Sequence, residues 1–304
     1  MNAPASAAAA PQPSPLTGLL LASAGAVGFS GKAIIVKLAY RHGVDAVTLI
    51  MLRMLFALPM FLLLAWWASR GKPPLERRDW VAIGALGFCG YYLSSFLDFA
   101  GLAYVSASLE RLVLYLNPTL VLLLGWVLFK RRVTGRQMAA LAVSYSGVLV
   151  VFGHELQWAG DHVALGAALV FGSALSYAVY LVYSGEVVGR LGSMRLTGLA
   201  TTVACILCIA QFLVLRPISA ATDVVPAVLW LSLLNATLCT FAPVLMVMMA
   251  IERIGSSLTA QTGMIGPLST ILMGVVLLGE PFTAWVAAGT ALVLSGVWLL
   301  TRWR

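Results

Sequence analysis

The chain carries at residues 106–151 the stretch SASLERLVLYLNPTLVLLLGWVLFKRRVTGRQMAALAVSYSGVLVV, and at residues 256–300 the stretch SSLTAQTGMIGPLSTILMGVVLLGEPFTAWVAAGTALVLSGVWLL. Aligned without a gap, the two segments place Pro118 against Pro267, 149 residues apart, and a shared Ser-Gly-Val at 146–148 against 295–297. Apolar helices often match by chance, but shared proline and glycine positions in one register are uncommon. The sequence therefore contains an internal repeat.

The composition indicates an integral membrane protein. Hydrophobic residues make up 61% of the chain and charged residues 10%, whereas a soluble domain has about 45–50% and about 25%. Such a chain needs a second apolar phase around it, which the bilayer supplies. The net charge of +8 does not indicate a nucleic-acid partner, because the bases stand in short loops between apolar runs. Cys205 and Cys208 form a CxxC without a second pair or a nearby His, so we expect no metal site and no cofactor.

Ten apolar runs have about the length that a membrane-spanning helix needs, roughly 20 residues. We expect an Ala- and Pro-rich disordered tail at residues 1–15. The predicted spans are 16–40, 45–69, 79–103, 106–129, 134–152, 163–187, 195–215, 224–251, 255–279 and 282–301. The fold class is therefore an all-α membrane protein with ten transmembrane helices.

The basic residues predict the orientation. With a cytoplasmic N-terminus, thirteen of the nineteen Lys and Arg fall in cytoplasmic loops or the C-terminal tail, three fall on the opposite side, and three lie within spans. Cytoplasmic loops carry the excess of Lys and Arg in membrane proteins. Both termini are therefore predicted to be cytoplasmic.

The repeat extends to two halves of five spans each, residues 16–152 and 163–301. An odd number of spans turns the second copy upside down relative to the first. Inverted repeats are typical of transporters that work by alternating access, with the solute site at the repeat interface near the middle of the membrane.

The two quoted segments resemble the EamA repeat of the drug/metabolite transporter superfamily, and the resemblance covers nearly the whole chain. It implies two inverted five-helix repeats around a central cavity, lined chiefly by the first, third, fourth, sixth, eighth and ninth spans. The chain looks most like the YddG-type amino-acid exporters, which implies a bacterial inner (plasma) membrane. One position departs from the pattern: the acid that follows the LLG-type run is present as Glu280, but Arg131 stands at the corresponding place in the first half.

Five ionisable residues stand inside predicted spans, namely Lys32, Arg53, Asp98, Glu110 and Arg111. A charge at the centre of a span costs about 2.5–3.5 kcal/mol on insertion scales, so such residues face a partner or a wet cavity. One interpretation is a structural ion-pair network. The other gives them work in transport, with Asp98 or Glu110 as the ion-coupling acid.

Tyrosine and hydroxyl side chains recur at helical spacing on three of the proposed cavity helices. Side chains three or four residues apart share one helix face. We therefore predict that the solute site includes Lys32, Tyr91, Asp98, Tyr115, Tyr177, Tyr180 and Gln261. The alternative is that these residues only pack helices together. The matched prolines Pro118 and Pro267 are predicted gating hinges, because proline removes a backbone donor and bends a helix.

These features predict a secondary transporter that exports amino acids or related small metabolites. The alternative is efflux of hydrophobic organic cations, for which tyrosines would provide cation-π contacts; a channel is a third interpretation. We expect no enzyme, since the sequence has no GxSxG and Trp158 replaces the second His of an HExxH that begins at His154. The expected partners are a small-molecule substrate and the lipid bilayer. Substrate identity, direction, coupling and oligomeric state stay open.

Overall fold

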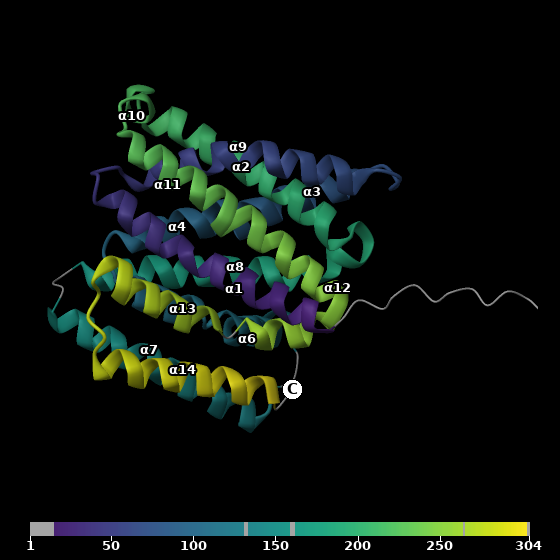
Figure 1. Ribbon diagram of the computed structural model, residues 1–304. Helices are drawn as coiled ribbons and strands as arrows, with labels where there is room; N and C mark the ends of the chain where they lie inside the picture. The colour runs from purple at the N-terminus through teal and green to yellow at the C-terminus, as the bar shows by residue number, and fades with distance from the viewer. Residues whose placement is uncertain (1–14, 131–132, 159–161, 264, 303–304) are drawn as a thin grey trace, which may run out of the picture.

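The computed structural model describes residues 15–130, 133–158, 162–263 and 265–302, and every regular element within these ranges is helical (Figure 1). The first half contains α1 (Pro15–Tyr40), α2 (Ala46–Ser69), α3 (Arg77–Gly87), η1 (Phe88–Leu93), α4 (Ser94–Leu102), α5 (Ala107–Leu114), α6 (Asn117–Phe129) and α7 (Gly135–Trp158). The second half contains α8 (Val163–Leu191), α9 (Ser193–Leu215), α10 (Ser219–Thr222), α11 (Pro226–Ala236), η2 (Thr237–Phe241), α12 (Ala242–Thr262), α13 (Ile265–Met273), η3 (Gly274–Leu278) and α14 (Ala284–Arg302). The three η elements are short π-helical segments that continue the helices around them.

Eight helical stretches in the described ranges are long and apolar enough to cross a membrane. Two further apolar stretches, Ile265–Leu278 and Ala284–Leu300, are shorter. Each of the ten predicted runs overlaps one of these ten stretches. The chain is therefore a multi-pass, all-helical membrane protein, as the composition predicts.

Several helices begin at a side chain that accepts a hydrogen bond from a backbone N–H group, and α2 and α5 are two of them. Asp45 caps α2 by accepting from the backbone of Val47 at 2.9 Å and from the hydroxyl of Thr48 at 2.6 Å. Partial burial opposes ionisation of Asp45, but the bonds from Thr48 and Val47 and the nearby charge of Arg216 outweigh it, so its pKa lies below the usual value. Ser106 caps α5 by accepting from the backbone of Leu109 at 2.9 Å.

The boundary predicted between the eighth and ninth spans is wrong. The sequence predicts a break at residues 252–254, but α12 continues to Thr262 and the next helix begins at Ile265. The charged residues Glu252 and Arg253 interrupt the apolar run at this point, and Gly255 follows them. An interior glycine costs a helix only about 1 kcal/mol, and Arg253 donates to the Met249 carbonyl one turn earlier at 2.8 Å. These residues are therefore compatible with a continuous helix.

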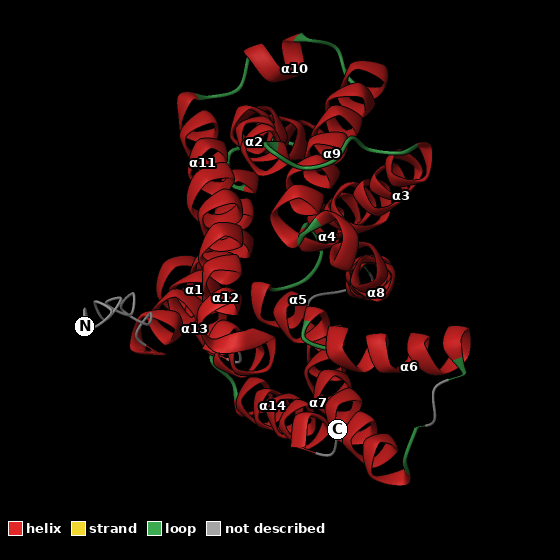
Figure 2. Cartoon of the chain, turned by 90° about the vertical axis from the view of Figure 1, so that its right-hand side faces the viewer, coloured by secondary structure: helices red, strands yellow, loops and turns green. Residues whose placement is uncertain are grey.

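Helices α7 and α14 pack along each other at one edge of the bundle, as both views show (Figures 1 and 2), and both also contact α5. Glycine permits this contact. A Cβ added to Gly147 would approach the Gly289 carbonyl oxygen to 2.6 Å, and a Cβ added to Gly289 would approach the Gly147 carbonyl oxygen to 2.6 Å. The two backbones touch directly, as small residues allow in membrane helices.

Several helices are interrupted within the bundle. α5 and α6 are separated at Tyr115 and Leu116, just before Pro118. The break between α12 and α13 likewise comes before Pro267, and Pro243 directly follows the start of α12 after η2. Proline removes a backbone donor and its ring crowds the preceding turn. π-Helical segments and breaks of this kind often mark functional sites in helices.

Candidate functional site

A cavity of about 340 Å³ lies among helices of both halves of the chain. The first half lines it from α1, α2, η1, α4, α5 and α6, and the second half from α8, η2 and α12. Its polar and aromatic lining comprises Phe29, Lys32, Arg53, Tyr91, Ser94, Ser95, Asp98, Arg111, Tyr115, Asn117, Ser173, Tyr177 and Thr240.

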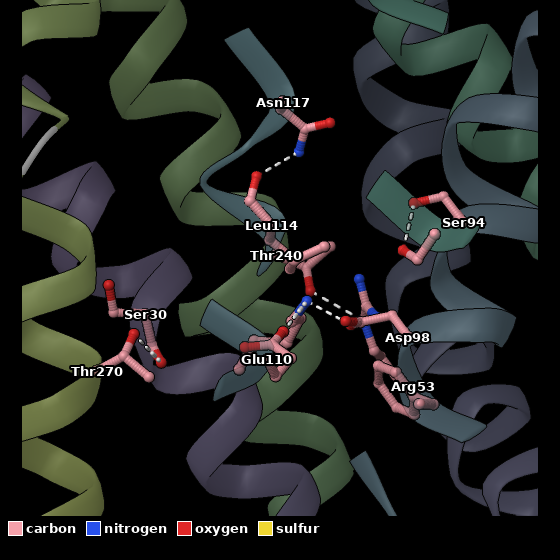
Figure 3. Close-up of polar contacts among 12 residues, drawn as sticks. Ser30, Arg53, Ser94, Asp98, Glu110, Leu114, Asn117, Thr240 and Thr270 are labelled. Carbon is pink, nitrogen blue, oxygen red and sulfur yellow. Dashed lines mark hydrogen bonds and ion pairs between the residues drawn. The ribbon is translucent and has the colours of Figure 1, made fainter. Parts of the chain in front are cut away.

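Lys32 of α1 is held between two carboxylates. Its Nζ donates to Asp98 Oδ2 of α4 at 2.5 Å and lies 3.2 Å from Glu110 Oε1 of α5 (Figure 3). The side chain of Lys32 is 15% exposed, that of Asp98 3% and that of Glu110 0%. Buried charges persist when they are paired. This triad therefore ties three helices together, with Asp98 facing the cavity and Glu110 behind it.

Arg53 of α2 reaches the same cavity from a different direction. Its Nε donates to Thr240 Oγ1 at 3.1 Å, and its guanidinium carbon lies 5.1 Å from the centre of the Phe99 ring. Thr240 in turn donates to the carbonyl of Asn235, five residues earlier, at 2.8 Å. The π-helical segment η2 thus turns the Thr240 hydroxyl toward Arg53.

Arg111 of α5 connects the broken helices. Its Nη2 donates to Ser30 Oγ at 3.2 Å. Ser30 Oγ lies 2.8 Å from the carbonyl oxygens of both Gly266 and Ala26, either of which can accept its single proton. Gly266 immediately precedes Pro267 at the start of α13. The hydroxyl of Thr270 also lies 3.5 Å from the Ser30 carbonyl oxygen (Figure 3). Arg111, one turn before the break between α5 and α6, is therefore linked through α1 to Gly266 beside Pro267.

Three tyrosines form an aromatic wall at one end of the cavity. The rings of Tyr91 and Tyr180 meet edge to face at 5.2 Å, and those of Tyr177 and Tyr180 stack at 5.5 Å. The hydroxyls of Tyr91 and Tyr180 are 3.3 Å apart. Tyr91 and Tyr177 line the cavity, whereas Tyr180 lies behind them against Gly90.

The structure brings most of the predicted site residues together. Lys32, Tyr91, Asp98, Tyr115 and Tyr177 all line the cavity. Tyr180 supports the wall from behind. Glu110 is fully buried and contacts Lys32, away from the lining. Gln261 belongs to α12, but its side chain lies outside the described part of the chain.

Eight of the polar and aromatic lining residues are absent from the predicted solute site, and Arg53 and Thr240 are two of them. Arg53 carried a sequence signal, since it is a base deep in an apolar span. Thr240 carried none, because its orientation depends on a π-helical segment that hydropathy does not reveal. Its hydroxyl nevertheless fixes the Arg53 guanidinium.

A second cavity of about 350 Å³ lies at the end of α1, lined by Lys37, Tyr40, Arg41, Leu102, Ala103, Leu278 and Glu280. Glu280 follows η3, and its carboxylate accepts from the backbone of Ala107 at 2.7 Å and from the hydroxyl of Ser108 at 2.9 Å. Glu155 of α7 accepts from the hydroxyl and backbone of Ser106. Two carboxylates therefore hold the N-terminus of α5, where the helix dipole favours negative charge.

Apolar spans, interrupted helices and a cavity shared by the two halves, with charged and aromatic side chains in its lining, define a polytopic membrane protein. The sequence profile of the EamA-like transporter family matches the chain twice, at residues 16–153 and 164–302. The chain belongs to this family.

Its relatives agree with this assignment. The uncharacterized transporter YcbK of Bacillus subtilis is 32% identical over 270 residues, covering 84% of this chain and 83% of that protein. An uncharacterized transporter of Archaeoglobus fulgidus is 25% identical over 277 residues, covering 90% and 93%. A crystal structure of another protein shares the fold, with a TM-score of 0.64 and 18% identity over 95% of this chain and 97% of that one. The family and its relatives are transporters, not enzymes, as the sequence predicts.

Proposed function

We propose that the chain is a secondary carrier with ten transmembrane helices, built as inverted five-helix repeats over residues 16–152 and 163–301. The family profile supports this by matching each half once. The helix breaks before Pro118 and Pro267 support it too, because they fall at the same point of the repeat. The carrier exposes its central cavity to each side of the membrane in turn, and the two proline-adjacent breaks serve as its hinges.

The solutes that fit this cavity best are amino acids or related small metabolites, moved outward across the bacterial inner membrane. One observation carries this proposal: three bases, one facing carboxylate and an aromatic wall surround a single cavity of about 340 Å³. That volume is within the range of small-molecule sites, about 300–1,000 Å³. Charged groups of both signs match the two ends of a zwitterion, while Tyr91, Tyr115 and Tyr177 offer apolar faces to a side chain.

The second candidate is efflux of hydrophobic organic cations. The aromatic wall favours it, since tyrosine faces attract cations. The three lining bases Lys32, Arg53 and Arg111 oppose it by like-charge repulsion. Transport assays with both solute classes distinguish these candidates.

Both termini are proposed to be cytoplasmic, supported by the thirteen-to-three division of loop and tail bases. Single cysteines placed in the 70–76 loop and in the loop that follows residue 130 test this. A membrane-impermeant maleimide added to intact cells should leave both unlabelled. Labelling of either loop from outside contradicts the orientation.

If protons drive transport, Asp98 is the better of the two predicted coupling acids, because it faces the cavity and Glu110 does not. A solute that binds beside Asp98 competes directly with the Asp98–Lys32 pair. Asp98→Asn should therefore abolish the dependence of transport on a pH gradient. If Asp98→Asn and Glu110→Gln both leave that dependence unchanged, neither acid couples transport.

The deciding experiment is transport by the purified full chain in liposomes. Radiolabelled amino acids and organic cations are followed in turn, with and without an imposed pH gradient, and protein-free liposomes give the background. Saturable movement of amino acids supports the proposal. Movement of organic cations alone favours the second candidate, and movement of neither class refutes both.

A further inference from the structure

The charges around the cavity do not balance. Three bases, Lys32, Arg53 and Arg111, stand against two acids, Asp98 and Glu110, in the buried cluster. A guanidinium stays protonated inside proteins, and a buried charge without a partner is costly. We infer that the Arg53 guanidinium binds the carboxylate group of the transported solute. This inference rests on the proposed function of the cavity as the solute site.

Lys32 is a poor anchor for that carboxylate because its ammonium already has two partners. It donates to Asp98 at 2.5 Å and lies 3.2 Å from Glu110. A solute carboxylate would have to displace one of these acids and leave it buried without its base. Lys32 therefore belongs to the framework of the cavity.

Arg53 differs from Lys32 because its charged end has no acid partner among the described residues. The residue is 6% exposed, and only its Nε is tied, to Thr240 at 3.1 Å. Within the described residues neither terminal nitrogen of Arg53 donates a hydrogen bond, and Nη1 is buried without an acceptor. No described carboxylate forms an ion pair with it. A buried donor of this kind needs an acceptor, and the cavity is where one can arrive.

The geometry selects a carboxylate over other acceptors. A guanidinium presents a planar fork that matches two oxygens side by side. The bond to Thr240 and the Phe99 ring at 5.1 Å fix the plane of that fork. An organic body attached to the carboxylate can then extend toward the aromatic wall on the same cavity.

Arg111 is the competing anchor, since it also lines the cavity. Its Nη2 is occupied by Ser30, which is joined to Gly266 beside Pro267. Arg111 is therefore tied to the helix break through Nη2, although its Nε is also buried without an acceptor. Arg53 is arranged the other way round: its Nε is bonded to Thr240, and the buried nitrogen without an acceptor is at its terminal end. The two arginines can be separated by experiment.

The test measures binding and does not require transport. Thermal stabilisation of the purified full chain is titrated with two matched pairs, L-phenylalanine against L-phenylalaninamide and 3-phenylpropionate against 3-phenylpropionamide. Each amide keeps the body of its acid and removes the negative charge. A ligand that binds the folded state raises Tm by an amount that grows with the logarithm of the ligand concentration divided by Kd. We expect the wild type to bind the acids about tenfold more tightly than the amides, as charge-assisted pairing predicts.

Arg53→Gln should remove this preference, whereas Arg111→Gln should retain it. If Arg53→Gln does not fold, Arg53→Lys keeps the charge without the fork, and the preference should fall at least about threefold. Thr240→Val should also weaken the preference, since it releases Nε. The inference is overturned if Arg53 variants keep the full preference, if Arg111→Gln removes it, or if the wild type does not prefer the acids. Acid preference without transport in liposomes would refute the proposed function alone.

Discussion

Replacing Lys32 with methionine should destabilise the protein severely. The substitution keeps the volume of the side chain but removes the charge that lies between Asp98 and Glu110. Both carboxylates then face each other in a buried site without their base. Water cannot solvate the Glu110 carboxylate, because this residue is completely buried.

The size of the effect follows from the burial of the triad. Removing one partner of a buried ion pair costs about 3–5 kcal/mol. Since each kcal/mol shifts Tm by about 2–4 °C in a domain of 150–250 residues, Lys32→Met should lower Tm on the order of 10 °C. The assay is thermal unfolding of the purified protein in mild detergent, followed by the fraction that stays monodisperse.

A rescue variant and a matched control test whether the three charges of the triad depend on one another. Lys32→Met combined with Asp98→Asn and Glu110→Gln removes all three charges and should recover most of the lost Tm. Lys37→Met makes the same substitution in the same helix, where no described acid forms an ion pair with the lysine, and should change Tm much less. A Lys32→Met protein as stable as the wild type, or a triple variant no better than the single, would show that the triad is not a mutually dependent unit.

Further substitutions test three other parts of the molecule. Tyr177→Ala should alter the preference among transported solutes, measured by uptake in liposomes, while expression and Tm stay close to wild type. Tyr180→Ala, behind the aromatic wall, should lower the free energy of unfolding by about 3 kcal/mol, measured by thermal unfolding. Glu280→Gln should weaken the cap of α5 and cost about 1 kcal/mol, visible as a Tm lower by a few degrees. Gly289→Leu should separate α14 from α7 and be recovered poorly from membranes, while Gly153→Leu, where an added Cβ meets nothing within 4 Å, is its control.

The membrane-spanning helices were predictable because hydropathy is a property of one segment at a time. A run of about 20 apolar residues must be helical in lipid, since its backbone has no other partner. The end of α12 was not predictable in this way. Residues 252–255 have a loop-like composition, and the long helix that contains them shows only in three dimensions.

The site was partly predictable for a similar reason. A charge inside an apolar span is a strong signal by itself, and Lys32, Arg53 and Asp98 all carried it. Which base pairs with which acid depends on the positions of four helices, and the sequence does not record it. The sequence predicts Lys32 as a solute ligand. The structure adds that Lys32 is paired with Asp98 and Glu110, whereas no described acid forms an ion pair with Arg53.

The repeat also explains the one acid that the first half lacks. Both halves end this helix with a residue in the left-handed region, Lys130 at φ 51° and Gly279 at φ 73°. The next residue is Arg131 in the first half and Glu280 in the second. The turn is therefore shared by the two halves, and the difference lies in the chemistry of the side chain that follows it.

The exchange of an acid for a base at this position corresponds to a difference in backbone structure in the opposite half. Glu280 caps a real helix start, the backbone N–H groups of Ala107 and Ser108. The corresponding residues of the second half, 256–257, lie inside the continuous helix α12, where backbone N–H groups already have helical partners. Arg131 lies outside the described residues, but a guanidinium can only donate and so cannot cap a helix start. Glu280 of the second half is thus an acid, and the first half begins a helix at the residues it contacts. The first half has no acid at position 131, and the second half has a continuous helix at residues 256–257. Suppose that the halves exchange these conformations during transport, so that a helix begins at residues 256–257. That helix start would have no acidic cap from position 131. The sequence therefore favours the arrangement in which α5 is the capped, separate helix.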